Sequence, residues 1–257
     1  MQYENIIKTK EDYKTLKEAT RISVKILKQL RDSVQIGVTA KSIDELTIEL
    51  CEENGVKPAF NGVDGVITPF WGNICISTND EILHTIPTER RVFKSGDIVK
   101  LDFGIVYKGF YTDHCVTVGL GKLSENEEAL IKTAKLCIDT ALKNAVIGKT
   151  IGDISSVMQN ICEISDFDFV TTYCGHGIGR SLHLAPEIPS YGEAGEGEVL
   201  QDGMVLCIEN QITIGMSDLK LSQDGWTLKT IDGSKGAMFE HMVIVRDGKP
   251  EILTSMD

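Results

Sequence analysis

The sequence has no basic run and no apolar segment of transmembrane length. Its 26 Lys and Arg residues are scattered among 38 Asp and Glu residues, so the formal net charge is -12. An acidic chain without a basic patch argues against a nucleic acid or an anionic membrane as partner. The N-terminal stretch MQYENIIKTKEDYK also lacks the apolar core of a signal peptide. We therefore expect a globular protein of the cytoplasm that binds neither nucleic acid nor membrane.

Cysteine pairs of the CxxC type are also missing, although the chain contains 7 cysteines. These thiols are odd in number and scattered, which disfavours both a disulfide framework and a structural zinc site. We therefore expect reduced cysteines in the core. A length of 257 residues allows one large domain or two small ones.

An internal repeat is present at a constant offset of 111 residues. An Ile-Gly pair, a Thr, an Ile and a Cys-Glu pair occur at Ile36-Gly37, Thr39, Ile43 and Cys51-Glu52, and again at Ile147-Gly148, Thr150, Ile154 and Cys162-Glu163. In each copy a long amphipathic helix precedes the Ile-Gly pair, and a shorter helix follows it. Two capping boxes are expected, Ser42-x-x-Glu45 in the first copy and Ser124-x-x-Glu127 in the second.

Strand patterns follow each predicted helix pair, at residues 98–114 in the first copy and at residues 203–215 and 239–248 in the second. This order predicts an α+β protein made of two duplicated halves. Such halves should join their sheets and place their helices on one side. A functional site would then lie at the junction of the halves.

Two aspartates interrupt the apolar stretch LDFGIVYKGFYTDH, residues 101–114. A hairpin turn at Lys108-Gly109 would place Asp113 on the returning strand, opposite Gly104, with Asp102 one diagonal step away on the same face. Two carboxylates side by side on a buried sheet repel each other and lose their hydration. At least one would protonate unless a cation lies between them.

Three further polar residues lie in or beside core-type strands: His176 in TTYCGHGIGRSLH, Glu209 in MVLCIEN and Glu240 in FEHMVIVRDG. Any one of them alone is more often solvated or salt-bridged. Together, four buried carboxylates need about two divalent cations to stay ionised. Carboxylates with one imidazole suit Mn(II), Fe(II), Co(II) or Zn(II) held as a reactive pair. Two such ions would share a water and lower its pKa, so metal-assisted hydrolysis is the natural chemistry.

These residues resemble the metal set of the methionine aminopeptidases, and the resemblance covers nearly the whole chain. The matching stretches are NICISTNDEILHTIP, GDIVKLDFGIVYKGFYTDH, CGHGIGRSLHLAP, GMVLCIEN and DGWTLKT followed by AMFEH. The resemblance implies the pita-bread fold, with pseudo-twofold halves, an antiparallel sheet and helices on one face. It also implies a single catalytic domain over residues 1–257 of the short type I form.

By this resemblance, two divalent ions would be bound by five residues. Asp102 would chelate one ion, His176 and Glu209 would hold the other, and Asp113 and Glu240 would bridge both. Glu209 is also the expected acceptor of a proton from the attacking water.

The resemblance also assigns residues that contact the substrate. His84 and His183 would stabilise the charge that develops on the scissile carbonyl. The residues expected to line a methionine pocket are Phe70, Cys75, Leu182 and Trp226. The chain departs from the family pattern at three positions, with Thr85 in place of glycine, Leu182 in place of phenylalanine and Asn210 in place of proline.

The implied activity is removal of N-terminal methionine from nascent proteins and peptides with a small second residue, by a monomeric enzyme. His114 and His241 follow ligands in strands, so we expect them to point to the opposite face. Cys174 lacks the base and orienting group that a Cys-His nucleophile requires.

Three other functions are weighed against this one. A proline-directed peptidase of the same fold would keep all five ligands but usually has an additional N-terminal domain. A non-catalytic binding module on this fold would be expected to lose ligands. A mononuclear iron oxygenase needs two histidines and one carboxylate on a different scaffold.

Overall fold

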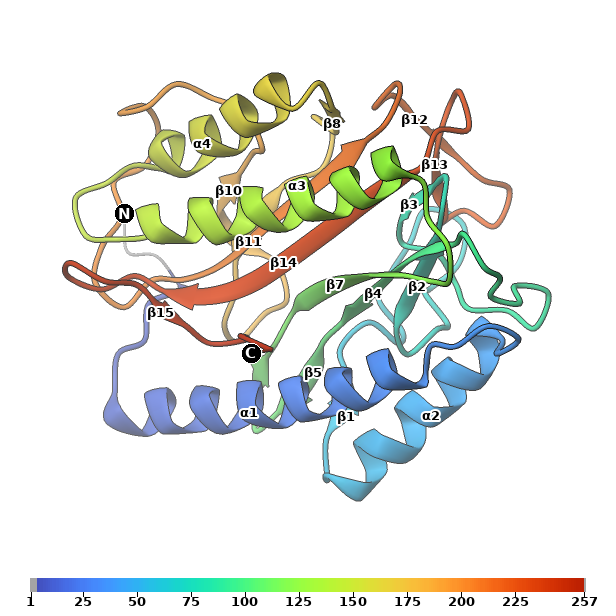
Figure 1. Ribbon diagram of the computed structural model, residues 1–257. Helices are drawn as coiled ribbons and strands as arrows, with labels where there is room; N and C mark the ends of the chain where they lie inside the picture. Colours follow the sequence, from blue (N-terminus) through green and yellow to red (C-terminus); the bar gives the residue numbers. More distant parts are fainter. Residues whose placement is uncertain (1–3, 257) are drawn as a thin grey trace.

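The computed structural model describes residues 4–256, which form four α-helices and fifteen strands (Figure 1). The helices are α1 (Lys10–Ser33), α2 (Ala40–Glu53), α3 (Glu125–Ala141) and α4 (Ile151–Ile164), with a 3-10 turn, η1 (Leu142–Asn144), after α3. Within residues 4–256, no helix is both long and apolar enough to cross a membrane.

The duplicated helix pairs are present, and the repeat offset is kept to the residue. Helices α2 and α4 each contain 14 residues, and their N-caps are Thr39 and Thr150. The predicted capping box at Ser124 is confirmed. The one predicted at Ser42 is wrong, because Thr39 has the extended backbone of a cap and its side chain accepts from the Ser42 N–H. Ser42 therefore lies inside the first turn.

The strands of the described chain form one nine-stranded sheet and two three-stranded sheets, and all of their pairings are antiparallel. The large sheet runs in the order β10-β9-β11-β14-β7-β4-β2, and β15 and β8 pair with its members β14 and β11. Its strands are β2 (Cys75–Thr78), β4 (Ile98–Phe103), β7 (His114–Gly119), β8 (Asp168–Phe169), β9 (Gly175–Gly177), β10 (Leu184–Ile188), β11 (Val205–Thr213), β14 (Gly236–Ile244) and β15 (Glu251–Ile252). One small sheet contains β1 (Lys57–Pro58), β5 (Ile105–Tyr107) and β6 (Phe110–Tyr111). The other contains β3 (Glu81–Leu83), β12 (Leu219–Leu221) and β13 (Leu228–Thr230).

The two halves join where β14 pairs with β7, at Glu240 and Cys115. Figure 1 places α3 across the long strands β11 and β14, and α1 beside β4 and β5. The predicted union of two half-sheets, with the helices on one side, is therefore confirmed. The predicted ligands Asp102, Glu209 and Glu240 lie on the opposite side of the sheet, which the helices do not cover.

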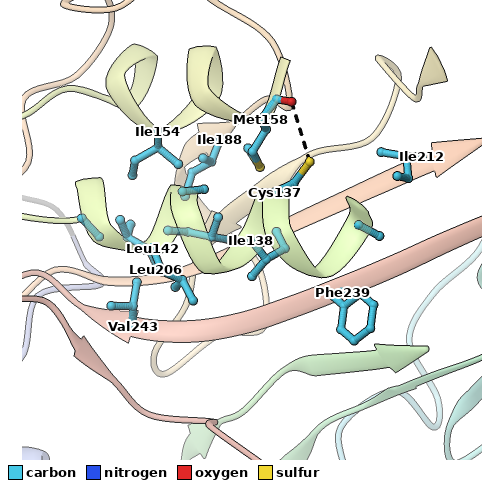
Figure 2. Close-up of a cluster of buried hydrophobic side chains, with 14 of the residues drawn as sticks. Cys137, Ile138, Leu142, Ile154, Met158, Ile188, Leu206, Ile212, Phe239 and Val243 are labelled. Carbon is cyan, nitrogen blue, oxygen red and sulfur yellow. Dashed lines mark hydrogen bonds between the residues drawn. The ribbon is translucent and has the colours of Figure 1, made fainter. Parts of the chain in front are cut away.

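The core lies between the helices and the sheet, and it follows the two-residue period of the strands. In the second half, alternate residues of β11 and β14, such as Leu206 and Val243, pack against Ile138 and Leu142 (Figure 2). The first half has an equivalent cluster under α1 and α2, in which Leu101 takes part. Since alternate side chains of these strands are buried under helices, their neighbours must face the other side.

Candidate metal centre

Three of the predicted ligands lie in one row across the sheet. Glu209 of β11 is paired with Glu240 of β14, Glu240 with Cys115 of β7, and Cys115 with Asp102 of β4. Directly opposed residues of neighbouring strands point to the same face. This row therefore brings carboxylates from both halves together on the side of the sheet that the helices leave open.

Asp113 reaches the same place from a break in the first-half hairpin. The turn is as predicted, with Tyr107 paired to Phe110 and positive φ at Lys108 and Gly109. However, β6 ends at Tyr111 and β7 begins at His114, so Asp113 lies between strands and not on the returning strand.

The cause of this break is the close approach of two backbones. A Cβ on Gly104 would lie 2.1 Å from the carbonyl oxygen of Thr112. The Thr112 hydroxyl also accepts a hydrogen bond from the Ile105 N–H at 2.9 Å. The interrupted ladder directs Asp113 toward His176, whose Nε2 is 3.9 Å from Asp113 Oδ2.

Ligand-type atoms in the described chain gather in three groups, each with mutual distances within 4.8 Å. The groups are Asp102, Asp113 and Glu240; His176, Cys207 and Glu240; and Asp113, His176 and His183. One oxygen each of Asp102, Asp113 and Glu240 is buried without a hydrogen-bond partner. Buried carboxylate oxygens without donors are the expected signature of a cation site.

The electrostatics of the protein alone are those of an uncompensated acidic cluster. Burial raises the pKa of Asp102 to about 7 and that of Glu209 to about 8. Burial, and then repulsion from neighbouring carboxylates, raises the pKa values of Asp113 and Glu240 well above their usual range. Burial lowers the pKa of His176 to about 4, so its imidazole is neutral and able to ligate. Divalent cations would take the place of the protons on the carboxyl groups.

A cavity of about 290 Å³ opens above this cluster. Its walls include all of the residues predicted for the substrate site, namely Phe70, Cys75, His84, Leu182, His183 and Trp226, and its floor includes the five predicted ligands. The rings of Phe70 and Trp226 meet edge to face with centroids 5.1 Å apart. The ring of His183 is 4.5 Å from that of His176. The structure thus brings every predicted site residue to one cavity.

His84 reaches the cavity through an unusual backbone conformation. Its φ is +54°, a value that costs of order 1–3 kcal/mol in a residue with a side chain and that the surrounding structure must therefore hold in place. The following residue, Thr85, is fully buried, and its hydroxyl accepts a hydrogen bond from Ser77 at 3.0 Å. Thr85 thus fixes the residue after His84 to β2, at a position where the family usually has glycine.

Asn210 and the two other histidines lie on the helix side of the sheet. The Asn210 side chain donates to the Ala134 carbonyl of α3 at 2.8 Å and accepts from the Phe239 N–H at 3.2 Å. His114 Nε2 pairs with Ser23 Oγ of α1 at 2.9 Å, and His241 Nδ1 with Thr254 Oγ1 at 3.1 Å. The expectation that these histidines point away from the ligands is confirmed.

Several contacts of the site were not foreseen from the sequence. Gln211 donates a short hydrogen bond to Glu209, Tyr173 packs edge-on against the His84 ring, and Met238 lines the cavity. Gln211 and Met238 each lie two residues from a predicted ligand, so the period of the strands alone could have placed them on this face. Tyr173 lies outside the named strands, and we find no pattern that would have indicated it.

Comparison with known proteins agrees with this geometry. The model of metallopeptidase family M24 matches residues 14–247. The chain is 36% identical over 249 residues to a methionine aminopeptidase of Clostridium acetobutylicum, covering 97% of this chain and 98% of that protein. It is 34% identical over 249 residues to methionine aminopeptidase 1 of Bacillus subtilis, with the same coverage.

Solved structures give the same result. The methionine aminopeptidase of Thermotoga maritima superposes with a TM-score of 0.92 at 36% identity, covering 97% of this chain and 98% of that one. Prolidases, such as that of Pyrococcus furiosus, share the fold at 22% identity and a TM-score of 0.75. The chain therefore belongs to metallopeptidase family M24 and, within it, to the methionine aminopeptidases. The pita-bread fold, the metallopeptidase class and the use of divalent metal, all predicted from the sequence, follow from this membership.

Proposed function

We propose that this chain removes methionine from the N-terminus of peptides and nascent proteins whose second residue is small. The observation that carries the proposal is the cavity itself. Four carboxylates and a neutral imidazole lie on its floor, and apolar, aromatic and sulfur-containing side chains form its walls. This combination suits hydrolysis beside a flexible thioether side chain.

Two divalent ions fit the donor set, because four clustered carboxylates would balance their charge. Asp102 would hold one ion, His176 and Glu209 the other, and Asp113 and Glu240 both. When bound, such ions supply an activated water nucleophile at neutral pH. Manganese, iron, cobalt and zinc all suit these ligands, and availability in the cell decides among them.

Glu209 is the residue best placed to accept a proton from the attacking water. It lines the cavity among the other predicted ligands, and an ionised carboxylate there can act as a general base. The carboxamide of Gln211 binds one of its oxygens and fixes the orientation of the carboxylate.

His84 and His183 would face the carbonyl oxygen of the bond that is cut. Burial lowers the pKa of His84 to about 4, and it also lowers the pKa of His183. Both rings are thus neutral at pH 7, and each can donate one N–H hydrogen bond. Donors fixed in this way stabilise the negative charge that develops on the oxygen during attack.

The side-chain pocket would lie between Phe70, Cys75, Leu182 and Trp226. The Trp226 Nε1–H donates to the Thr68 carbonyl at 2.8 Å, so the indole is fixed and presents its ring to the cavity. A pocket of this kind discriminates between side chains that differ by one methylene by about 1–3 kcal/mol. Leucine and norleucine peptides should therefore be cut, but more slowly than methionine peptides.

The test is the ratio of kcat/KM values for four peptides, each measured with Mn(II), Fe(II), Co(II) and Zn(II). Met-Ala-Ser should be the best substrate, ahead of Leu-Ala-Ser, Met-Leu-Ser and Ala-Pro. Equal cleavage of Met-Ala-Ser and Met-Leu-Ser, or a preference for Ala-Pro, would refute the methionine assignment while leaving a metalloaminopeptidase.

Both halves contribute ligands to one site, which supports residues 1–257 acting as a single catalytic domain. We expect this domain to act as a monomer on nascent chains in the cytoplasm. Light scattering on the active protein checks the monomer, since a stable dimer would double the measured mass.

A further inference from the structure

Cys207 lies on the metal side of the sheet, next to two of the ligands. It belongs to β11, where it is paired with His176 of β9, and it precedes Glu209 by two residues. Its side chain is fully buried. The Cys207 sulfur, a ring nitrogen of His176 and a carboxylate oxygen of Glu240 all lie within 4.8 Å of one another.

An ion in this group would replace the proton that Cys207 shares with Glu240. The thiol lies 3.9 Å from the Asp113 carbonyl oxygen and also hydrogen-bonds to the Glu240 carboxylate, so its sulfur lies directly beside a predicted ligand. Glu240 is 2% exposed, and its Oε1 has no hydrogen-bond partner. His176 Nδ1 pairs with the Gly177 carbonyl at 3.0 Å, which leaves Nε2 free to ligate.

Glu209, the carboxylate that the family resemblance assigns to the His176 ion, is bound differently. Its Oε2 accepts the short hydrogen bond from Gln211. Among the described residues, none of the three groups of ligand atoms includes Glu209. One of the two groups around His176 therefore contains a thiol in addition to a carboxylate.

We propose that the Cys207 thiolate is a direct ligand of the metal ion held by His176 and Glu240. This inference rests on the metal binding of the proposed function and adds a sulfur donor to it. On binding, the Cys207 S–H bond breaks, its proton leaves to solvent, and the sulfur lone pair forms the bond to the ion. A metal–sulfur distance of about 2.3 Å and a metal–nitrogen distance of about 2.1 Å place the two donors at most about 4.4 Å apart, so donors within 4.8 Å of each other would close in on the ion.

A thiolate in this position would change which metals the site prefers. Sulfur is a soft donor, which favours zinc, cobalt and iron, whereas an all-oxygen and nitrogen set is better suited to manganese. The group of ligand atoms at Asp102 contains only carboxylates, and these would hold the other ion. The two ions would therefore differ in identity or affinity, with the softer metal at His176.

Cys115 offers a matched control. It is buried, it lies on the same face in the row between Asp102 and Glu240, and its sulfur also makes one long contact, 3.9 Å to the Met238 carbonyl oxygen. Cys115 is not a member of any group of ligand atoms found in residues 4–256. Loss of its thiol should leave the metal spectrum unchanged.

The decisive experiment is X-ray absorption at the metal edge of the full-length protein loaded with Zn(II) or Co(II). A sulfur ligand gives a scatterer at about 2.3 Å, separate from nitrogen and oxygen at about 2.0–2.2 Å. We expect one sulfur shared over the bound ions, and a thiolate-to-cobalt charge-transfer band in the Co(II) protein. Both signals should persist in Cys115→Ser and disappear in Cys207→Ser.

The selectivity of metal binding provides a second measurement. Competition between Zn(II) and Mn(II) should favour zinc at least tenfold less strongly in Cys207→Ser than in the wild-type protein. Wild-type protein that binds metal and cuts Met-Ala-Ser but has no sulfur scatterer would overturn the inference and leave the proposed function intact. Protein that binds no metal would overturn both. Because the absorption test uses wild-type protein, it does not depend on the folding of any variant.

Discussion

The two halves of the molecule bring their carboxylates to the same place by different means. In the second half, β11 and β14 pair without interruption from Val205 and Ile244 to Thr213 and Gly236, and the glutamates occupy facing positions. In the first half, the hairpin is broken at Gly104, and its two aspartates come from a strand and from the break. Asp102 lies on a regular strand, in the same row of facing positions as the two glutamates. Asp113 lies outside that row and reaches the cluster only because the hairpin is interrupted.

The halves also differ in how they fix their long helices to the sheet. In the first half, Ser23 of α1 joins both Thr112 and His114, at 3.0 and 2.9 Å. In the second half, one residue of β11, Asn210, reaches the backbone of α3 and of β14. Each is a buried polar contact at the residue beside a ligand, and each fixes the register on which the ligand positions depend.

The largest expected effect is the difference in metal content between a variant of a residue that would bind one ion, Asp102, and a variant of one that would bind both, Glu240. Asp102→Asn should retain close to one ion per chain, because the second set of ligands is intact. Glu240→Gln should lose both ions, because Glu240 belongs to groups on either side. Turnover of Met-Ala-Ser should fall by roughly a thousandfold or more in Glu240→Gln, as expected when a group essential to the transition state is removed. Metal content by plasma emission spectroscopy, together with kcat, provides the check.

Equal metal loss in the two variants would mean that the halves do not hold separate ions. His241→Gln, which alters the neighbour of Glu240 on the helix side, is the control and should keep both ions.

The next effect concerns the break in the first half. In Gly104→Ala the new methyl group would lie 2.1 Å from the Thr112 carbonyl oxygen, so the backbone must move. Overpacking of this kind costs about 3 kcal/mol, and it should also displace Asp113 and weaken metal binding. β11 contains no glycine, so the second half offers no equivalent site. Urea unfolding of the metal-free protein measures the cost.

Gly179→Ala is the matched control, because the nearest atom to its new methyl group is 3.7 Å away. Its stability should stay within about 0.5 kcal/mol of wild type. A Gly104→Ala protein as stable as this control would show that the close approach is not needed.

A third effect is the response of the metal-free protein to pH. A carboxyl with a raised pKa binds its proton more tightly when folded, so its contribution to stability is full below the unfolded pKa and is lost as the pH rises through the folded one. The pKa is about 7 for Asp102 and about 8 for Glu209, so their contributions to stability are lost completely only at a pH above these values. Stability should change by about 1.4 kcal/mol per pH unit for each net proton.

Other buried groups narrow the window in which this effect is visible. Burial lowers the pKa of His114 to about 3 and that of His176 to about 4, so these rings oppose the carboxyls below about pH 6.5, the pKa of an unfolded histidine. Burial lowers the pKa of Lys100 to about 7, so above pH 7 this residue makes stability rise with pH. It is one group against several carboxyls, whose opposite effect is larger. Between pH 6.5 and 8 the melting temperature of the EDTA-treated protein should therefore fall, whereas that of the metal-loaded protein should not. A metal-free melting temperature that rises over this range would contradict the acidic cluster.

The regular parts of this molecule could be predicted from sequence, and the irregular parts could not. The repeat offset and the common order of helices and strands indicated the duplicated fold, and polar residues such as Glu209 stood out against apolar strands. The position of Asp113 between strands depends on a backbone contact at Gly104, which has no local signal. Cys207 carried no signal either, because a cysteine in an apolar strand is typical of any core.

The smallest effect tests the helices that the repeat places in equivalent positions. Thr39 and Thr150 both cap a 14-residue helix, but only Thr150 has a full capping box, in which Asp153 accepts from its backbone N–H at 2.9 Å. Loss of a cap costs about 1 kcal/mol. Thr150→Ala also removes the hydroxyl contact to Asp153, whose pKa is lowered mainly by the Thr150 N–H and less by Lys149 and the Thr150 hydroxyl.

We therefore expect Thr150→Ala to destabilise the protein slightly more than Thr39→Ala, by a few tenths of a kcal/mol, since the N–H bond to Asp153 can persist without the hydroxyl. The Ser counterparts of both substitutions should restore stability, because serine keeps the accepting oxygen. Urea midpoints of the four metal-loaded variants, compared at equal slope, measure the difference. Thr39 and Thr150 form equivalent bridges, to Val92 and Val199, so a larger cost for Thr39→Ala would show that the capping box does not add to the stability of the second-half helix.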